Sequence, residues 1–407
     1  MEKIKVGCIG FGRRGPDMLK TVLSMCRDVT VAAVCDSYAD RAENARKIVF
    51  DHTGVSPFTT TDAFEVTRMK GLDAVLIFSA WESHVPLAID AMEQGKYAAF
   101  EVGGAYTPGD CFRLVETYER TGVPCMMLEN CCYGRVELAV LNMVRSGMFG
   151  KIVHCSGGYH HDLRDEIAGG DKNRHYRLRN YLARNCENYP THELGPIAKV
   201  MDINRGNRMV SLSSVASGSF GMEEYIKERP EEYPGLQGRH FDQGDVVNTT
   251  ITCADGSTIA LTLDTTLPRF YSREFTVRGT RAAYLGLCDG IFVDGADSED
   301  FNTKRHWGSG AKYRREYIHP LWKKYGRRAR LAGHDGMDFM VLSAFFEAVR
   351  KKTDTPIDAY DSAAWMSVTP LSEQSIKQGG APVDIPDFTH GLWEKEREKL
   401  PLEFALD

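Results

Sequence analysis

Short apolar runs alternate with amphipathic segments along the first third of the chain. The runs suit buried strands, and they occupy residues 4–9, 30–35, 74–78, 97–100 and 124–128. Segments typical of helices lie at 38–50, at 84–95 and after Thr107-Pro108-Gly109-Asp110, where threonine can cap and aspartate suits the positive helix end. This alternation predicts an α/β domain with a doubly wound parallel sheet, which we expect to span residues 1–129.

The pattern changes to hairpins beyond Gly150. Asp255-Gly256 separates the runs 248–253 and 258–263, and later turns are indicated by Gly279-Thr280 and Asp289-Gly290. Helices are expected after Thr191 and over 337–351. We therefore predict a second, α+β domain over 130–407, with an open, mostly antiparallel sheet covered by helices.

The length of the chain indicates how many domains it has, and its net charge indicates which kind of partner it binds. A chain of 407 residues exceeds the usual size of one hydrophobic core, which agrees with two domains. The formal net charge is −6 and the pI is about 6.1, which favours a small-molecule partner over a nucleic acid. The exception is the basic segment 304–330, which we interpret as a solvated lid or subunit-contact arm rather than an anion-binding surface.

The cysteines and the apolar runs bear on metals and membranes. The chain has 11 cysteines, several of them inside strand-like runs, such as Cys8, Cys35 and Cys253, so we expect reduced thiols. No C-x-x-C pair or zinc-ligand spacing occurs, which predicts no metal. Nothing in the sequence resembles a signal peptide or a membrane span, so we expect a cytoplasmic protein without a membrane partner.

A glycine-rich turn after the first strand indicates a dinucleotide. Gly10, Gly12 and Gly15 match G-x-G-x-x-G between a strand and a helix, where backbone N–H groups can approach a pyrophosphate. Asp36 at the end of the second strand would accept hydrogen bonds from the adenosine ribose. Its charge favours NAD over NADP, although Arg13, Arg14 and Arg41 are cations that could pair with a 2′-phosphate. The sequence thus predicts a Rossmann domain that binds NAD.

The same features support a resemblance to a known superfamily. The glycine turn, the strand ending Phe100-Glu101 and the antiparallel second half resemble the Gfo/Idh/MocA oxidoreductases across nearly the whole chain. Those proteins usually carry Glu-Lys-Pro after the fifth strand, whereas this chain has Glu101-Val102-Gly103 and lacks the lysine.

That departure, together with several ordered motifs, closely resembles glycoside hydrolase family 109, a family of NAD-dependent α-N-acetylgalactosaminidases. The motifs are Met127-Leu128-Glu129-Asn130, Gly157-Gly158-Tyr159-His160-His161-Asp162, Tyr189-Pro190-Thr191-His192, Asp202-Ile203-Asn204-Arg205-Gly206-Asn207-Arg208, Pro268-Arg269-Phe270-Tyr271-Ser272 and Gly333-His334-Asp335-Gly336-Met337-Asp338.

The resemblance implies contacts to both ligands. Besides the three glycines, the implied cofactor contacts are Arg13, Arg14, Asp36, Trp81, Glu82, Ser83, His84, Glu101, Val102, Asn130 and Tyr189. The implied substrate contacts are Tyr159, Arg177, Tyr189, Pro190, Thr191, His192 and Tyr271. Arg177 competes with three neighbouring arginines in the same loop, Arg174, Arg179 and Arg184.

The resemblance also implies an unusual hydrolysis. NAD⁺ transiently oxidises C3 of the sugar, a base removes the acidified C2 proton, the C1 substituent is eliminated, water adds, and C3 is reduced again. This route needs no carboxylate pair at glycosidase spacing.

Two residues are the candidates for proton transfer. His192 follows the predicted start of a helix, whose positive end would favour a neutral imidazole, so we interpret it as the acid/base at the C3 hydroxyl; the alternative is a structural histidine. Tyr271 could move a proton at C2 or the glycosidic oxygen, or serve as a stacking platform for the sugar.

Four further residues, Tyr159, His160, His161 and Glu129, have predicted roles that the sequence supports less directly. Tyr159 and His161 are two apart on a strand and share a face, so we expect both to point into the cleft and bind the substrate, whereas His160 faces away and is predicted to be structural. Glu129 either binds a sugar hydroxyl or neutralises Arg135.

Two other functions remain alternatives. One is an NAD-dependent sugar or inositol dehydrogenase that oxidises a ring hydroxyl, and the other is a non-catalytic NAD(H)-responsive binding protein. In each case the partner is a small molecule, a glycoside in the favoured interpretation. We also expect a homo-oligomer formed through the C-terminal sheet.

Overall fold

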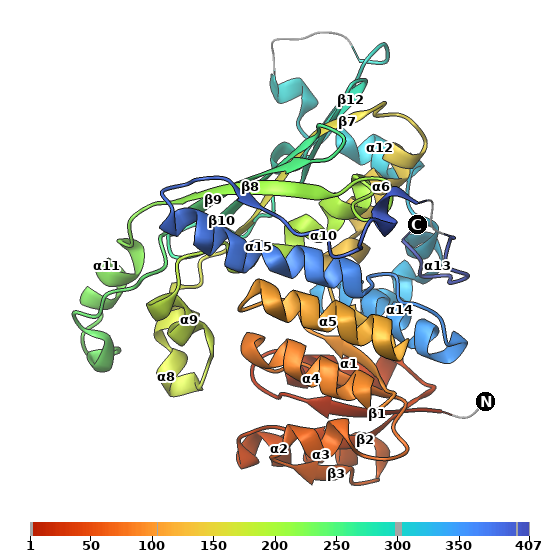
Figure 1. Ribbon diagram of the computed structural model, residues 1–407, viewed down its shortest axis with the longest axis vertical. Helices are drawn as coiled ribbons and strands as arrows, with labels where there is room; N and C mark the ends of the chain where they lie inside the picture. Colours follow the sequence, from red (N-terminus) through yellow and green to blue (C-terminus); the bar gives the residue numbers. More distant parts are fainter. Residues whose placement is uncertain (1–2, 104, 298–302, 396–397, 407) are drawn as a thin grey trace. The chain divides into compact units, whose positions relative to one another are not determined.

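The computed structural model describes residues 3–103, 105–297, 303–395 and 398–406 (Figure 1). The chain forms two compact units, of which the first comprises residues 1–133, 320–363 and 397–407 and the second residues 134–319 and 364–396. The first unit therefore takes in segments from the far end of the sequence. The single domain boundary that we place at residue 129 stays a prediction.

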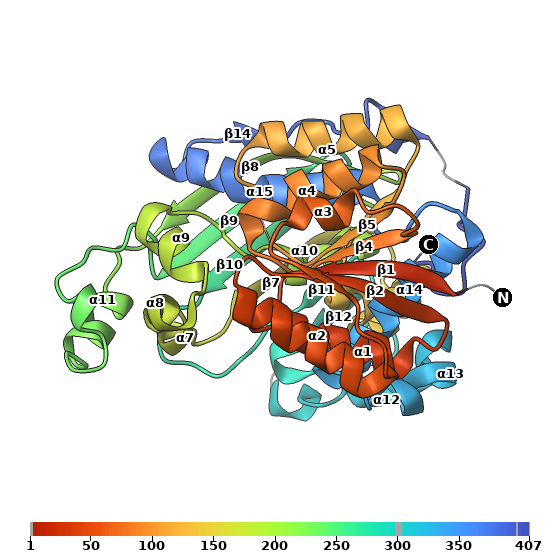
Figure 2. The same cartoon turned by 90° about the horizontal axis from the view of Figure 1, so that it is seen from below.

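The first unit contains a six-stranded parallel sheet in the order β3-β2-β1-β4-β5-β6. Its strands are β1 Ile4–Ile9, β2 Val29–Cys35, β3 Phe58–Thr60, β4 Ala74–Ile77, β5 Tyr97–Phe100 and β6 Cys125–Met127. Its helices are α1 Gly15–Met25, α2 Ala39–Thr53, α3 Ala63–Thr67, α4 Trp81–Glu93, α5 Pro108–Thr121, α13 Pro320–Ala329 and α14 Met337–Lys351. Figure 2 shows α1 and α2 on one face of this sheet and α3, α4 and α5 on the other, which confirms the doubly wound arrangement.

The predicted elements of this unit are confirmed with small shifts. The capping box before α5 forms, because the Thr107 hydroxyl accepts from the Asp110 N–H and the Asp110 carboxylate accepts from the Thr107 N–H. Helix α4 begins at Trp81, three residues before the predicted start, because Ala80 has the extended conformation of an N-cap. Strand β3 and helix α3 were not predicted, since three and five residues are too short for a periodic pattern.

The second unit contains an eight-stranded sheet in the order β13-β12-β11-β7-β10-β9-β8-β14. Its strands are β7 Ile152–His160, β8 Met209–Ala216, β9 Val246–Cys253, β10 Thr258–Asp264, β11 Thr276–Gly279, β12 Ala282–Leu285, β13 Gly290–Val293 and β14 Val383–Asp384. Among the strand pairings of this sheet that the structure describes, only β7–β10 is parallel, so the mostly antiparallel sheet is confirmed.

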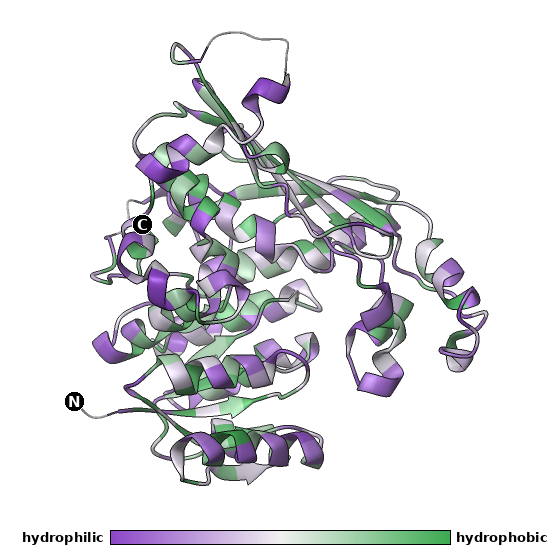
Figure 3. Cartoon of the chain, turned by 180° about the vertical axis from the view of Figure 1, so that it is seen from behind, coloured by the Kyte–Doolittle hydropathy of each residue, from purple (hydrophilic) through white to green (hydrophobic). Residues whose placement is uncertain are grey.

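Helices of the second unit cover one face of this sheet, with α10 packed on β7 and β10. The helices are α6 Arg135–Arg145, α7 Arg164–Ala168, α8 Gly170–Asn173, α9 Arg177–Ala183, α10 Thr191–Val200, α11 Gly221–Lys227 and α12 Gly310–Glu316, and α15 Ala359–Lys377 runs from the first unit into the second. Figure 3 shows both hydrophilic and hydrophobic segments on many helices, as expected for helices that pack on a sheet by one side.

Two further observations concern the whole chain. All 11 cysteines are free thiols, and only Cys288 is not buried. Within the described ranges, no helix combines the length and the apolar character required to cross a membrane.

Candidate active site

The glycine turn between β1 and α1 has the geometry that a dinucleotide requires. Gly10 adopts φ +95°, and a Cβ there would lie 2.5 Å from the backbone nitrogen of Ser79. At Gly12 the nearest atom to a Cβ would be Arg41 Nη1 at 3.6 Å, so that position is open on its outer side. The turn leads into α1 at Gly15, whose N-terminus carries the positive end of the helix dipole. The turn therefore fits a pyrophosphate.

Asp36 lies beside the turn and is almost fully buried. Its Oδ2 accepts a hydrogen bond from the Phe11 N–H at 2.6 Å, and its Oδ1 accepts one from the Tyr38 N–H at 2.9 Å. A carboxylate oxygen has a second lone-pair site, so each oxygen can still accept from a ribose hydroxyl. The predicted NAD-binding role of Asp36 is thus compatible with its structural role in the turn.

Three of the predicted cofactor residues meet in one cluster. The Arg14 guanidinium donates from Nε to Glu101 Oε1 at 3.0 Å and binds Asp338 through both terminal nitrogens. Asn130 Nδ2 donates to Asp338 Oδ1 at 2.8 Å. The sequence did not indicate Asp338 as a site residue, because it lies 324 residues from Arg14.

The Trp81–His84 turn forms the start of α4. His84 is buried with Nε2 3.0 Å from the Ser79 carbonyl oxygen, and burial lowers its pKa to about 4. The Ser83 hydroxyl donates to the Ala80 carbonyl at 2.7 Å. Of the remaining predicted cofactor residues, Arg13 and Glu82 are exposed and Val102 is buried.

Packing explains why a glycine stands at position 103, after Glu101 and Val102. Gly103 adopts φ +150°, and a Cβ there would lie only 2.2 Å from the Trp81 ring. Trp81 is buried, so its ring has little room to move away. A proline, which often stands at this position in the wider superfamily, would therefore clash with Trp81.

In the second unit, five predicted residues bring their rings together. The Tyr159 ring centroid lies 4.4 Å from that of Tyr189, 5.6 Å from that of His192 and 6.3 Å from that of Tyr271. The His161 ring lies 5.2 Å from that of Tyr271, and its Nδ1 is 3.0 Å from the Tyr159 hydroxyl. Residues from β7, the 185–190 loop, α10 and the loop after β10 thus form one aromatic cluster.

Arg177 completes this cluster. Its guanidinium carbon lies 4.9 Å from the Tyr189 ring centroid, and its Nε donates to Glu166 Oε1 at 2.7 Å. The Arg177 side chain is buried, unlike those of the three competing arginines of the loop. Arg174 and Arg179 are exposed, and Arg184 is half-buried and pairs with Glu373. The geometry favours Arg177 among the four.

The loop that carries Tyr271 is anchored to the end of β7. Ser272 and His160 exchange two backbone hydrogen bonds, of 2.9 and 3.1 Å. His160 is buried and its Nδ1 lies 3.2 Å from Glu274 Oε1, in agreement with the predicted structural role. Tyr271 itself is 51% exposed, so its phenol is accessible.

His192 is the second residue of α10, as predicted from its neighbours. The helix begins at Thr191, which is fully buried, and Pro190 precedes it. The imidazole is half-buried, at the positive end of the helix.

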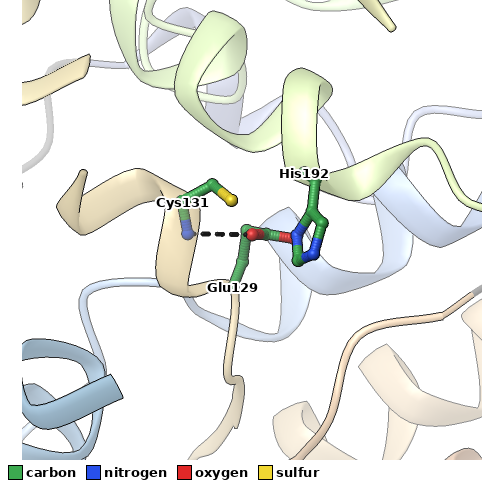
Figure 4. Close-up of side chains that lie close together, drawn as sticks. All are labelled: Glu129, Cys131 and His192. Atoms are coloured by element: carbon green, nitrogen blue, oxygen red, sulfur yellow. Dashed lines mark hydrogen bonds between the residues drawn. The ribbon is translucent and has the colours of Figure 1, made fainter. Parts of the chain in front are cut away.

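Glu129 belongs to the first unit and is fully buried. The backbone N–H of Cys131 donates to its Oε1 at 3.0 Å, as the dashed line in Figure 4 shows. Whether its second oxygen binds a sugar hydroxyl or balances the charge of Arg135 stays an open prediction.

No local sequence pattern indicates the residues that hold the loop before His192. Gln243 donates through Nε2 to the Cys186 carbonyl and accepts from Asn188 Nδ2, both at 3.0 Å. From the other side, Thr369 and Ser372 of α15 bond the carbonyl and the N–H of Glu187, both at 2.9 Å. Such contacts join distant segments and leave no local pattern.

Comparison with known protein families assigns both parts of the chain. Residues 4–129 match the oxidoreductase family with an NAD-binding Rossmann fold, and residues 133–395 match the C-terminal domain of glycosyl hydrolase 109. The fold is also found in solved structures: levoglucosan dehydrogenase in complex with NADH and L-sorbose has a TM-score of 0.68 at 16% identity, covering 95% of this chain and 100% of that one. An inositol dehydrogenase homolog from Azotobacter vinelandii in complex with NAD⁺ also has a TM-score of 0.68 at 16% identity, with 94% and 97% covered.

Relatives of known family cover the chain from end to end. A glycosyl hydrolase family 109 protein of Stenotrophomonas maltophilia is 38% identical, covering 100% of this chain and 92% of the relative. An α-N-acetylgalactosaminidase of Tannerella forsythia is 37% identical, with 96% and 87% covered. This chain therefore belongs to glycosyl hydrolase family 109 and is a glycoside hydrolase with an NAD-binding Rossmann domain.

Proposed function

We propose that this protein hydrolyses α-N-acetylgalactosaminides, or closely related glycosides, by transient oxidation of C3 and elimination across C1 and C2. The observation that carries the proposal is the cluster of Tyr159, His161, Tyr189, His192 and Tyr271 in the second unit. It brings imidazole and phenol groups together, and such groups can move the protons that elimination requires. The substrate class is supported by the relatives from Tannerella forsythia and Shewanella oneidensis, each 37% identical and described as α-N-acetylgalactosaminidases.

The cofactor would be held by the glycine turn, by Asp36 and by the cluster of Arg14, Glu101, Asn130 and Asp338. When bound, NAD supplies reversible oxidation of the C3 hydroxyl, which acidifies the proton at C2. The chain's own residues then have to move protons at three atoms: the C3 oxygen, C2 and the glycosidic oxygen.

His192 is our candidate for the proton of the C3 hydroxyl, since its imidazole lies at the positive end of α10. Tyr271 is our candidate for the proton at C2 or at the glycosidic oxygen. Burial raises the pKa of Tyr159, which keeps that phenol protonated and able to donate a hydrogen bond. Arg177 can hold a substrate oxygen while its stacking on Tyr189 keeps it in place.

Hydrolysis in D₂O tests this proposal. After a panel of nitrophenyl α- and β-glycosides has identified a substrate, the released sugar is analysed for deuterium at C2 under initial-rate conditions. We expect deuterium at C2 and no consumption of NAD⁺ in proportion to product.

Hydrolysis without C2 deuterium, in the wild type and in Tyr271 variants that cannot shield the abstracted proton, would contradict the elimination route. Accumulation of NADH with an equal amount of keto-sugar would identify a dehydrogenase instead. Tyr271→Phe separates proton transfer from stacking, because the variant keeps the ring and loses the hydroxyl. A near-normal rate for that variant would assign Tyr271 to stacking.

A further inference from the structure

The side chain of Arg14 is bound mainly by the protein, although it lies in the glycine turn of the NAD site. Nε donates to Glu101 at 3.0 Å, Nη1 lies 2.9 Å from His334 Nδ1, and the two terminal nitrogens form a bidentate pair with Asp338 at 2.7 and 2.6 Å. A guanidinium has five N–H donors, and these contacts occupy most of them. Little hydrogen-bonding capacity remains for a phosphate.

Asp338 is the centre of this cluster. The residue is fully buried in the first turn of α14, and it also accepts from Asn130 Nδ2 at 2.8 Å. Burial alone would raise the pKa of its carboxyl, but the hydrogen bonds and the positive charge of Arg14 lower that pKa far below its usual range. The carboxylate is therefore ionised and paired with Arg14 at neutral pH.

The backbone before Asp338 is strained in a way that serves these contacts. His334, Asp335 and Gly336 adopt φ values of 49°, 52° and 100°, so three consecutive residues are in the left-handed region. Gly333 faces Asp338 so closely that a Cβ would lie 2.5 Å from Asp338 Oδ2. Strained backbone persists where the surroundings hold it, and it is common at ligand clamps.

The strained segment and the turn come from opposite ends of the chain but belong to the same unit. Helix α14 packs against α1, the helix that begins at the glycine turn. The contact between Arg14 and Asp338 therefore fixes the turn to a second helix.

We propose that Asp338 is a positioning residue of the NAD site: through Arg14 it holds the turn 10–15 in its binding conformation, so that segment 333–338 slows the release of NAD. The sequence had suggested Arg14 as a direct cofactor contact or as a partner for a 2′-phosphate. In the structure its main role is to join the turn to α14. The inference concerns cofactor binding alone and does not depend on the reaction proposed above.

The rate at which bound NADH leaves the full-length protein tests this inference. It can be measured by stopped-flow fluorescence after mixing NADH-loaded protein with excess NAD⁺, without any sugar. Asp338→Asn keeps the shape of the side chain and removes its charge, and we expect it to release NADH at least about tenfold faster, since a charge-assisted hydrogen bond is lost.

Asp51→Asn is the matched control, because it makes the same chemical change on an exposed side chain of α2, outside both the glycine turn and segment 333–338. We expect its release rate to stay within about twofold of the wild-type rate, as is usual for a surface substitution. Gly333→Ala keeps every charge but pushes the Asp338 carboxylate away from Arg14, so we expect faster release from this variant as well.

A double-mutant cycle decides whether Asp338 acts through Arg14. In an Arg14→Ala background, Asp338→Asn should change the release rate little, because its partner is already absent. The inference is overturned if Asp338→Asn lowers the melting temperature without changing NADH release, or if its effect on release is equally large without Arg14.

Discussion

Asp36 and His192 show how the local surroundings of a residue determine its chemistry. Asp36 is tied by two backbone N–H groups at the turn between β1 and α1, so its charge is fixed where a ribose would bind. His192 lies at the start of α10 among aromatic rings and is half-buried. The first residue is suited to binding and the second to moving a proton.

Substitution of these two residues should therefore separate binding from turnover. We expect His192→Ala to lower kcat on the best glycoside by about 10²- to 10⁴-fold, the usual contribution of a general acid/base, with little change in NAD affinity. Asp36→Ala should instead weaken NAD binding. Calorimetry for NAD and phenol release for turnover measure the two effects, and near-normal turnover by His192→Ala would disprove its assigned role.

Glu187 is a buried acid two residues before Tyr189, and it gives the protein a specific dependence on pH. Burial raises its pKa from 4.5 to about 8, while the Tyr189 N–H opposes the shift. The folded state therefore holds a proton that the unfolded state releases above pH 4.5. The free energy of unfolding should fall by about 1.4 kcal/mol per pH unit between those pKa values from this group alone.

Glu187→Gln tests this expectation, because glutamine resembles the neutral acid at every pH. Below about pH 4.5 the wild type and the variant should unfold at similar denaturant concentrations. As the pH rises towards 8, the wild type should lose stability relative to the variant. Parallel stability curves for the two proteins over this range would show that Glu187 is ionised in the folded state.

At the scale of helices and strands, the sequence predicted the elements whose residue pattern is local. The strand, glycine turn and helix at residues 4–25 are consecutive, and Asp255-Gly256 identifies its hairpin directly. Helix α15 was missed, because most of its first three turns are buried on every side and show no amphipathic period. Its residues Thr369 and Ser372, which support the loop of Tyr189, were missed with it.

This loop provides a prediction at the same scale. Gln243→Ala removes the hydrogen bonds to Cys186 and Asn188, so it should lower stability by about 1–3 kcal/mol and raise KM for the glycoside as Tyr189 loses its support. Gln237→Ala is a suitable control, since within the described residues the Gln237 side chain bonds the Ile226 and Tyr233 carbonyls, which are not part of this loop. If Gln243→Ala loses stability but keeps its KM, the loop does not position the substrate.

At the scale of the molecule, the sequence predicted two folds but not which segments complete each unit. Residues 320–363 return to the first unit after seven of the eight strands of the second unit's sheet, and the Arg14–Asp338 contact depends on that return. Local patterns carry no information about pairings over such a distance. The candidate site was found in the same way: motifs indicated the ring residues, but not the distant side chains that hold them.

The second sheet has an outward face that its helices leave uncovered, and on three neighbouring strands most of its side chains are small and uncharged. Asp264 at the end of β10 lies on the same face and pairs with Arg269. Cross-strand pairing places on this face Ser211, Ser213 and Val215 of β8, Asn248, Thr250 and Thr252 of β9, and Thr258, Ala260 and Thr262 of β10. On β9 these positions are exposed and alternate with buried ones. A broad face of mostly small, uncharged residues is suited to packing against a second copy of the same face.

We therefore expect the protein to form a homo-oligomer through this face, and we expect charged residues introduced on the face to disrupt it. Val215→Glu combined with Thr250→Glu places like charges opposite each other across any symmetric contact, and it should convert the protein to monomers in light scattering at micromolar concentration. Both positions are exposed, so the fold and the melting temperature should change little. Phe50→Glu on α2 of the first unit is the control, because it adds charge at a similarly exposed apolar position, 47% accessible, away from the sheet. A wild-type protein that is already monomeric, or a double variant that keeps the wild-type mass, would show that this face is not the interface.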